Sequence, residues 1–189
     1  MLVVFFMCLF LNIAFSQDDE EESTEKPYQR FKGCRFDRFE EFPCLNRYEL
    51  VDFANNKPRS FENLRLKMYF SDKRPIICLH NDVNQLTFGF YKNSKTFGIF
   101  KSHKDWMTGQ EPCVMRENVT LFSEEVYTEV DLTLTRDSRI SIFVHGNEEE
   151  KGFLLTCRVC YKFHPEAITV RLGYNKQLGN GDLFFDCPF

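Results

Sequence analysis

Residues 125–147 contain two runs in which apolar and polar side chains alternate. The apolar positions are Val126, Val130, Leu132 and Leu134 in the first run and Ile140, Ile142 and Val144 in the second. Polar residues take the opposite face, with Glu129, Asp131 and Thr133 in the first run and Ser141 and His145 in the second. Such alternation, rich in β-branched residues, is typical of a strand with one buried face. Because a short polar link at residues 136–139 joins the runs, the pattern predicts an antiparallel β-hairpin.

Further short strands are predicted from residue 63 onward. They are expected at residues 64–70, 76–80, 86–91, 97–100, 114–115, 153–163, 168–172 and 183–185. Turn signals recur about every 8–12 residues, and no run of apolar residues has the period of an α-helix. A polar loop is expected at residues 102–112. The pattern predicts an all-β fold, an antiparallel β-sandwich or barrel.

The N-terminal segment resembles a targeting sequence. Residues 2–15 are apolar apart from Asn12, and small residues at Ala14 and Ser16 precede an acidic stretch. The run is shorter than the roughly 20 residues that span a bilayer, so it predicts a secretory signal peptide. We therefore expect a secreted, extracellular protein without a membrane span. The predicted parts are the signal peptide (1–16), an acidic disordered segment (17–26), an irregular N-terminal extension (27–62) and the β-sandwich domain (63–189).

The charge of the chain is concentrated near its start. The chain has 24 basic and 28 acidic residues, and six of the acids lie within residues 18–25, which leaves 22 acids against 24 bases elsewhere. Nucleic-acid binding needs a concentrated basic surface. A nearly neutral folded part therefore argues against a nucleic-acid partner.

Cysteine usage agrees with export to an oxidising compartment. Removal of Cys8 with the signal peptide leaves seven candidates for disulfides: Cys34, Cys44, Cys78, Cys113, Cys157, Cys160 and Cys187. The pairings expected are Cys34–Cys44 and Cys78–Cys113, with Cys187 bonded to either Cys157 or Cys160. The odd count leaves one thiol free or bonded to a second chain, so a disulfide-linked dimer is an alternative to a monomer.

Candidate chemistry along the chain is sparse. Cys157 and Cys160 form a CxxC motif, for which redox and zinc roles are alternatives, but a strand would point the two side chains to opposite faces. We therefore expect each to have a different partner. The four histidines and the carboxylates are scattered, and no nucleophile motif accompanies them. The sequence predicts a protein that is not an enzyme, with no catalytic residue, metal or cofactor.

One modification motif lies in a predicted loop. Asn118, Val119 and Thr120 form an N-glycosylation sequon. The polar context in an exported chain predicts a glycan on Asn118.

The order of strands over residues 64–186 resembles a galectin carbohydrate-recognition domain. The similar features are Trp106 followed by Glu111, the Val144-His145-Gly146 segment that ends a hairpin, and the Gly181-Asp182-Leu183 segment of the last strand. The resemblance implies a jelly-roll sandwich and, less directly, a sugar ligand. An aromatic side chain such as that of Trp106 can stack on the apolar face of a sugar ring.

The chain also departs from the galectin pattern. Where the family has polar donors on its sugar-contacting strand, this chain has Thr87, Gly89 and Tyr91, and Trp106 and Glu111 are five residues apart rather than three. The signal peptide and the disulfides are foreign to the family as well. The hypothesis that follows is a secreted binding protein whose partner is a glycan, held by Trp106 and Glu111. The alternative is an extracellular protein-protein interaction domain without sugar binding, in which Trp106 belongs to the core.

Overall fold

The computed structural model describes residues 30–39, 46–49, 53–71, 74–81, 84–91, 95–108, 112–123, 125–160, 169–174 and 181–189. Residues 31–189 form one compact unit. The description below concerns that unit.

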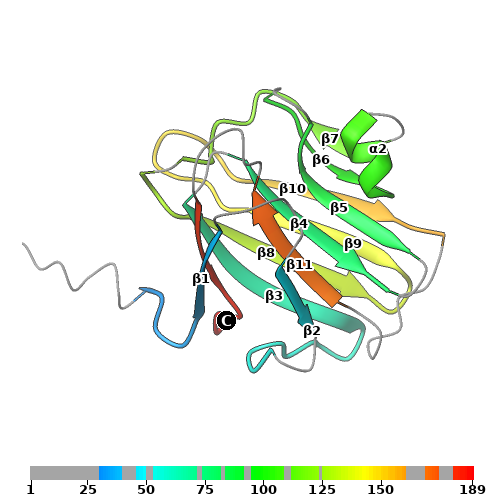
Figure 1. Cartoon of the computed structure of the whole chain (residues 1–189), viewed down its shortest axis with the longest axis horizontal. Helices are drawn as coiled ribbons and strands as arrows, with labels where there is room; N and C mark the ends of the chain where they lie inside the picture. Colours follow the sequence, from blue (N-terminus) through cyan, green and yellow to red (C-terminus); the bar gives the residue numbers. More distant parts are fainter. Residues whose placement is uncertain are drawn as a thin grey trace, which may run out of the picture. The chain divides into compact units, whose positions relative to one another are not determined.

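Nearly all regular structure in this unit is β-strand (Figure 1). The strands are β1 (Arg35–Phe39), β2 (Asn46–Glu49), β3 (Glu62–Ser71), β4 (Pro75–His80), β5 (Gln85–Phe90), β6 (Phe97–Phe100), β7 (Pro112–Arg116), β8 (Thr128–Thr135), β9 (Arg139–Val144), β10 (Phe153–Arg158), β11 (Thr169–Tyr174) and β12 (Gly181–Phe185). One short helix, α2 (His103–Thr108), lies between β6 and β7.

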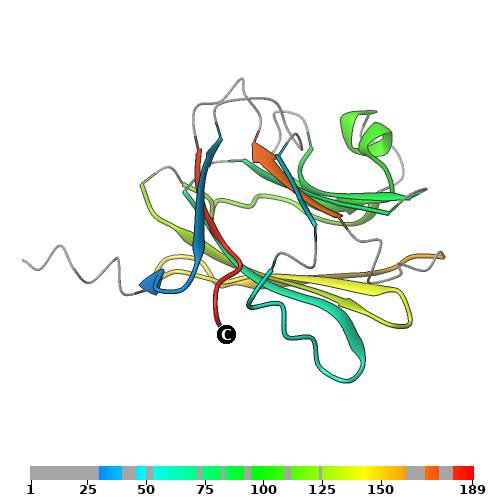
Figure 2. The same cartoon turned by 60° about the horizontal axis from the view of Figure 1, so that its bottom comes forward.

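The strands form two antiparallel six-stranded sheets, which Figure 2 shows as two layers. Sheet A has the order β1-β12-β3-β8-β9-β10, and sheet B has the order β2-β11-β4-β5-β6-β7. The predicted hairpin is β8–β9, with Leu132 opposite Ile142 and Leu134 opposite Ile140. The fold is the predicted antiparallel β-sandwich.

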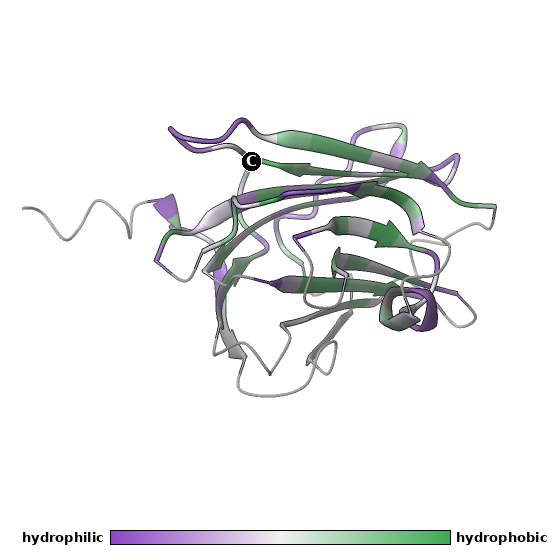
Figure 3. Ribbon diagram, turned by 90° about the horizontal axis from the view of Figure 1, so that it is seen from above, coloured by the Kyte–Doolittle hydropathy of each residue, from purple (hydrophilic) through white to green (hydrophobic). Residues whose placement is uncertain are grey.

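A single large apolar cluster fills the space between the sheets. The alternation along β8 buries Val130, Leu132 and Leu134 with at most 1% of each side chain exposed, while the residues between them are only partly buried. Leu79 and Phe88 of sheet B join the same cluster. Figure 3 shows hydrophobic residues concentrated on the strands and hydrophilic ones at several turns. The period-2 pattern therefore decides which face of each strand points inward.

The N-terminal extension is more regular than expected. The sequence predicted an irregular segment, but Arg38 lies in β1 and Arg47 in β2. These strands pair with β12 and β11, so the extension supplies an edge strand to each sheet. Pairing with distant strands therefore gives the extension a regular structure that its local sequence does not indicate.

Two other predicted segments differ from the structure. The predicted polar loop at residues 102–112 contains α2, whose first turn is held by the Ser102 hydroxyl, which accepts a hydrogen bond from Asp105 N at 3.0 Å. The strand predicted at residues 153–163 ends at Arg158. Cys160 therefore lies just beyond the end of β10. No described helix is long and apolar enough to cross a membrane.

The predicted disulfide pairings are wrong for the cysteines whose partners the structure describes. Cys34 bonds Cys187, and Cys113 bonds Cys157. Cys78 is also disulfide-bonded, and its partner lies outside the described residues. Sequence proximity misled the prediction, because Cys34 and Cys187 are 153 residues apart but stand next to the paired strands β1 and β12.

The two cysteines of the CxxC motif do not bond each other, as predicted, but only Cys157 has the separate partner expected for each. Cys157 is buried and bonded to Cys113, whereas Cys160 is free and exposed. The Cys113–Cys157 bond connects β7, an edge strand of sheet B, with β10, an edge strand of sheet A. It therefore links the two layers along one side of the sandwich.

Candidate functional site on the outer face of sheet A

The outward side chains of β3, β8 and β9 form a polar surface that we call the outer face of sheet A. Lys67 lies opposite Asp131, which in turn lies opposite Phe143. One step along the strands, Thr133 lies opposite Ser141. Two features occupy this face: a hollow at the β8–β9 turn and a charged cluster further along the strands.

The hollow has a volume of about 610 Å³. Its walls come from the segment before β3 and from the β8–β9 hairpin: Ser60, Phe61, Glu62, Thr133, Thr135, Arg136, Asp137, Arg139 and Ser141. The backbone amide of Arg136 donates to the carbonyl oxygen of Phe61 at 2.9 Å. This bond holds the two walls together.

Hydrogen bonds order the turn that forms one wall of the hollow. The Thr135 hydroxyl donates to Asp137 Oδ1 at 2.5 Å and accepts from the backbone amide of Arg139 at 3.1 Å. Ser138 takes a left-handed conformation with φ 63°, and its carbonyl oxygen accepts from Val159 N at 3.0 Å. The turn is therefore fixed both locally and by the chain that follows β10.

The electrostatics of the turn favour an ionised Asp137. The hydrogen bond from Thr135 lowers the pKa of this carboxyl group, and the positive charges of Arg139 and Arg158 lower it further. Arg158 Nη2 lies 3.8 Å from Asp137 Oδ2, and both side chains are half exposed or more. The hollow therefore presents a fixed carboxylate beside guanidinium groups and hydroxyls.

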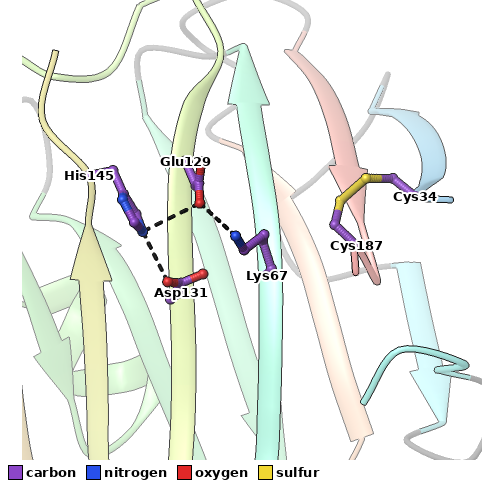
Figure 4. A network of polar contacts seen from close by, with 6 residues as sticks. All are labelled: Cys34, Lys67, Glu129, Asp131, His145 and Cys187. Atoms are coloured by element: carbon purple, nitrogen blue, oxygen red, sulfur yellow. Dashed lines mark hydrogen bonds and ion pairs between the residues drawn. A yellow bond between two sulfur atoms is a disulfide. The ribbon is translucent and has the colours of Figure 1, made fainter. Parts of the chain in front are cut away.

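The charged cluster, shown in Figure 4, consists of Lys67, Glu129, Asp131 and His145. His145 Nε2 lies 2.9 Å from Asp131 Oδ2 and 3.5 Å from Glu129 Oε1, and Lys67 Nζ lies 2.9 Å from Glu129 Oε1. The side chains are between 14% and 34% exposed. The cluster is accessible to solvent but only from one side.

Two details of the cluster bear on its chemistry. Burial lowers the pKa of Lys67, but the hydrogen bond and charge of Glu129, with Tyr69 and Asp131, outweigh it and leave that pKa raised. Asp131 Oδ1 is buried and has no hydrogen-bond partner among the described residues. Three ligand atoms, one carboxylate oxygen each from Glu129 and Asp131 and one ring nitrogen from His145, lie within 4.8 Å of one another, so these residues could hold a metal ion.

The predicted ligand-binding residues stay predictions. Trp106 lies in α2, but its side chain is not described, and Glu111 lies outside the described residues. The structure does not test whether the two meet. Asn118 is exposed in the loop after β7 with φ 56°, and its sequon partner Thr120 is hydrogen-bonded to Glu150.

The positions of β5 that were compared with the sugar-contacting strand of galectins are largely buried. Thr87 has no exposed surface, and Gly89 is buried as well. Thr87 lies 3.8 Å from the sulfur of Cys78, next to a small apolar cluster that includes Phe100 and the partly buried Tyr91. Thr87 and Gly89 are therefore packed and present no polar surface to a ligand.

No pattern in the sequence indicated the hollow or the charged cluster. The available signal was the alternation that places Glu129, Asp131 and His145 on polar faces. His145 is 14 positions from Asp131 in the sequence, and Lys67 is 64 positions away. Only the register of β8 against β3 and β9 brings these residues together, with Lys67 directly opposite Asp131. The first wall of the hollow likewise comes from a segment remote in sequence.

Comparison with known proteins gives only remote likenesses. No family model and no curated protein matches the chain. Among solved structures, lectin II from Ulex europaeus is 10% identical, with 66% of this chain and 73% of that chain covered and a TM-score of 0.39. The CBM2 module of the evolved Dit of Lactobacillus casei BL23 phage J-1 is 9% identical, with coverages of 66% and 62% and a TM-score of 0.34. Such low scores carry no argument about function, and the class defined by the topology is that of antiparallel β-sandwiches.

Proposed function

We propose that the protein is a secreted, non-enzymatic glycan-binding protein whose sugar site is the hollow on the outer face of sheet A. The observation that carries the proposal is the composition of the hollow. An exposed phenyl ring, Phe61, stands beside the hydroxyls of Thr133 and Ser141 and the charged groups of Asp137 and Arg139.

A sugar ring needs both kinds of surface. Its C–H face stacks on an aromatic ring, and its hydroxyls need a few directed donors and acceptors. Phe61 is 55% exposed and can offer its ring to a ligand. Asp137 accepts hydrogen bonds and Arg139 donates them, so neighbouring hydroxyls of one sugar would find complementary partners.

The size and order of the hollow support this use. A volume of about 610 Å³ lies within the range of roughly 300–1,000 Å³ usual for small-ligand sites. The hydrogen bonds of Thr135 and the Arg136–Phe61 backbone bond already hold the walls in place. A preformed site loses less conformational entropy on binding.

Secretion is proposed on separate grounds. The apolar N-terminal segment has the pattern of a signal peptide, and disulfides such as Cys34–Cys187 persist in oxidising compartments. The Asn118 side chain is exposed and open to glycosylation. When the chain is expressed in cultured animal cells, the protein should appear in the culture medium, begin at Gln17 and carry a glycan on Asn118. N-terminal sequencing and peptide mass analysis measure these two features.

The ligand proposal is tested by a glycan-array screen of the folded full chain, followed by titration with the best glycan. Phe61→Ala should weaken binding by about tenfold, since stacking of an aromatic ring is worth roughly 0.5–1.5 kcal/mol beyond the area it buries. Arg139→Ala should weaken binding by a similar factor. The matched control is Phe36→Ala, because Phe36 is 53% exposed but lies outside the hollow. The bound glycan should be recovered intact, and its hydrolysis would contradict the non-enzymatic part.

Trp106→Ala separates this site from the one proposed on sequence grounds. Loss of binding in this variant, with Phe61→Ala unaffected, would move the sugar site to Trp106 and Glu111. No binding to any glycan would remove the ligand proposal and favour the protein-protein interaction alternative. The exposed Cys160 and the 60% exposed Leu154 of edge strand β10 are the features that suit such a partner.

A further inference from the structure

We propose that Glu129, Asp131 and His145 form a binding site for a divalent first-row transition-metal ion, with Zn²⁺ as the reference ion. The site belongs to the charged cluster of Figure 4 and does not depend on the glycan proposal. No sequence motif indicated it, because the ligands come from β8 and from the residue that follows β9.

The three donor atoms already surround a common point. His145 Nε2 lies 2.9 Å from Asp131 Oδ2 and 3.5 Å from Glu129 Oε1, and all three atoms fall within 4.8 Å of one another. Two ligands of a tetrahedral ion, each about 2.1 Å from the metal, lie about 3.4 Å apart. Small rotations of the side chains would therefore suffice to coordinate an ion.

The type of donor selects the class of ion. One imidazole nitrogen with two carboxylate oxygens suits Zn²⁺ and related ions, whereas Mg²⁺ and Ca²⁺ prefer sets made of oxygen alone. Three protein ligands also leave at least one position for water or another ligand. The site is thus of the open kind.

A second observation points to a missing partner at this place. Asp131 Oδ1 is buried and accepts no hydrogen bond from any described residue. A buried carboxylate oxygen without a partner is costly, because it has lost its hydration. A cation held by Asp131 would compensate this loss by direct coordination or through its bound water.

The strand backbone holds the ligands rigidly. Glu129 and Asp131 are next-but-one neighbours on β8, which directs both to the same face. The backbone amide of His145 donates to the Glu129 carbonyl oxygen at 2.9 Å, and the imidazole packs edge-on against Phe143 at 4.5 Å. Ordered ligands of this kind lower the entropic cost of binding an ion.

Lys67 moderates the affinity of the site. Its ammonium group lies 2.9 Å from Glu129 Oε1, the same oxygen that faces His145. An incoming cation must share Glu129 with Lys67 or displace it. Removal of this lysine should therefore strengthen metal binding, whereas in a cluster that serves only as an ion-pair network it would have no such effect.

The experiment is isothermal titration of the folded full chain with ZnCl₂, in a Cys160→Ser background because an exposed thiolate also binds Zn²⁺. The expected result is one Zn²⁺ per chain, with weaker binding of Mg²⁺ and Ca²⁺. Asp131→Asn and His145→Gln should each weaken Zn²⁺ binding about tenfold or more. Lys67→Met should strengthen it about two- to fivefold, the range expected from one partly exposed ion pair.

The control variant is Glu117→Gln, which removes an exposed carboxylate outside the cluster and should leave Zn²⁺ affinity unchanged. The ¹⁵N chemical shifts of the His145 ring can be measured without any variant. The shift of Nε2 should change when Zn²⁺ is added. The proposal is overturned if the parent chain binds no Zn²⁺, if Nε2 of His145 does not respond, or if folded Asp131→Asn and His145→Gln variants bind as tightly as the parent.

Discussion

At the residue scale, the β8–β9 turn shows how one hydroxyl sets the charge of a candidate binding surface. Thr135 donates to Asp137 Oδ1 and accepts from the backbone amide of Arg139, so it connects the carboxylate to the start of β9. The hydrogen bond favours the ionised carboxyl and lowers the pKa of Asp137. Asp137 is thereby kept as an acceptor at acidic pH.

Replacement of Thr135 by Val should raise the pKa of Asp137 toward its ordinary value, because the side chain keeps its shape and loses the donor. The folded pKa lies below the unfolded one, so the ionised form stabilises the fold above the unfolded pKa of about 3.9. This stabilisation disappears as the pH falls through the folded pKa. Titration of the carboxyl carbon by NMR measures the shift, and Thr156→Val serves as the control. An unchanged Asp137 pKa in Thr135→Val would refute this account.

At the element scale, the end of the β9–β10 hairpin depends on two glycines that face each other across the turn. A Cβ on Gly152 would lie 2.6 Å from the carbonyl oxygen of Val144 and 2.7 Å from the nitrogen of Gly146. Asn147 closes the turn, since its side-chain oxygen accepts from the amides of Glu149 and Glu150 at 2.9 and 2.7 Å. The two strand ends can therefore approach closely only without side chains.

Gly152→Ala should cost about 1–3 kcal/mol in the free energy of unfolding, because the backbone of the turn must move to admit the methyl group. Urea denaturation followed by circular dichroism measures this loss. The neighbouring exposed Lys151→Ala should stay within about 0.5 kcal/mol of the parent protein. Equal stability of Gly152→Ala and the parent would show that the turn can relax without cost.

At the scale of the whole molecule, the Cys113–Cys157 disulfide connects the two sheets through their edge strands β7 and β10. The two cysteines are 44 positions apart in the sequence. Cys157 belongs to the main core, and the partly buried Cys113 packs against it. Cross-links of this length restrict the unfolded chain and leave the folded state relatively more stable.

The double variant Cys113→Ala/Cys157→Ala should lose about 2–4 kcal/mol of unfolding free energy, in line with the entropy of the opened loop. Denaturant unfolding under non-reducing conditions is the measurement. The matched control is Cys160→Ser, which removes the exposed free thiol and should change stability by no more than about 0.5 kcal/mol. A similar loss in both variants would mean that the cross-link itself is not the cause.

The sequence alone determined the fold class and most of the strands. Alternation in residues 125–147 predicted the β8–β9 hairpin and its inward face, because a period of two is a local property of an extended backbone. The same pattern assigned Glu129, Asp131 and His145 to polar faces. Their common face followed once the hairpin was in register.

Only the tertiary structure decided which distant residues meet. The strands β1 and β2 and the pairing of Cys34 with Cys187 depend on contacts between segments remote in sequence, for which local patterns carry no information. The same holds for the hollow, whose walls are Phe61 and the β8–β9 turn, and for Lys67 beside Glu129. The hairpin thus supplies residues to both candidate sites, and β3 and the segment before it add Lys67 and Phe61.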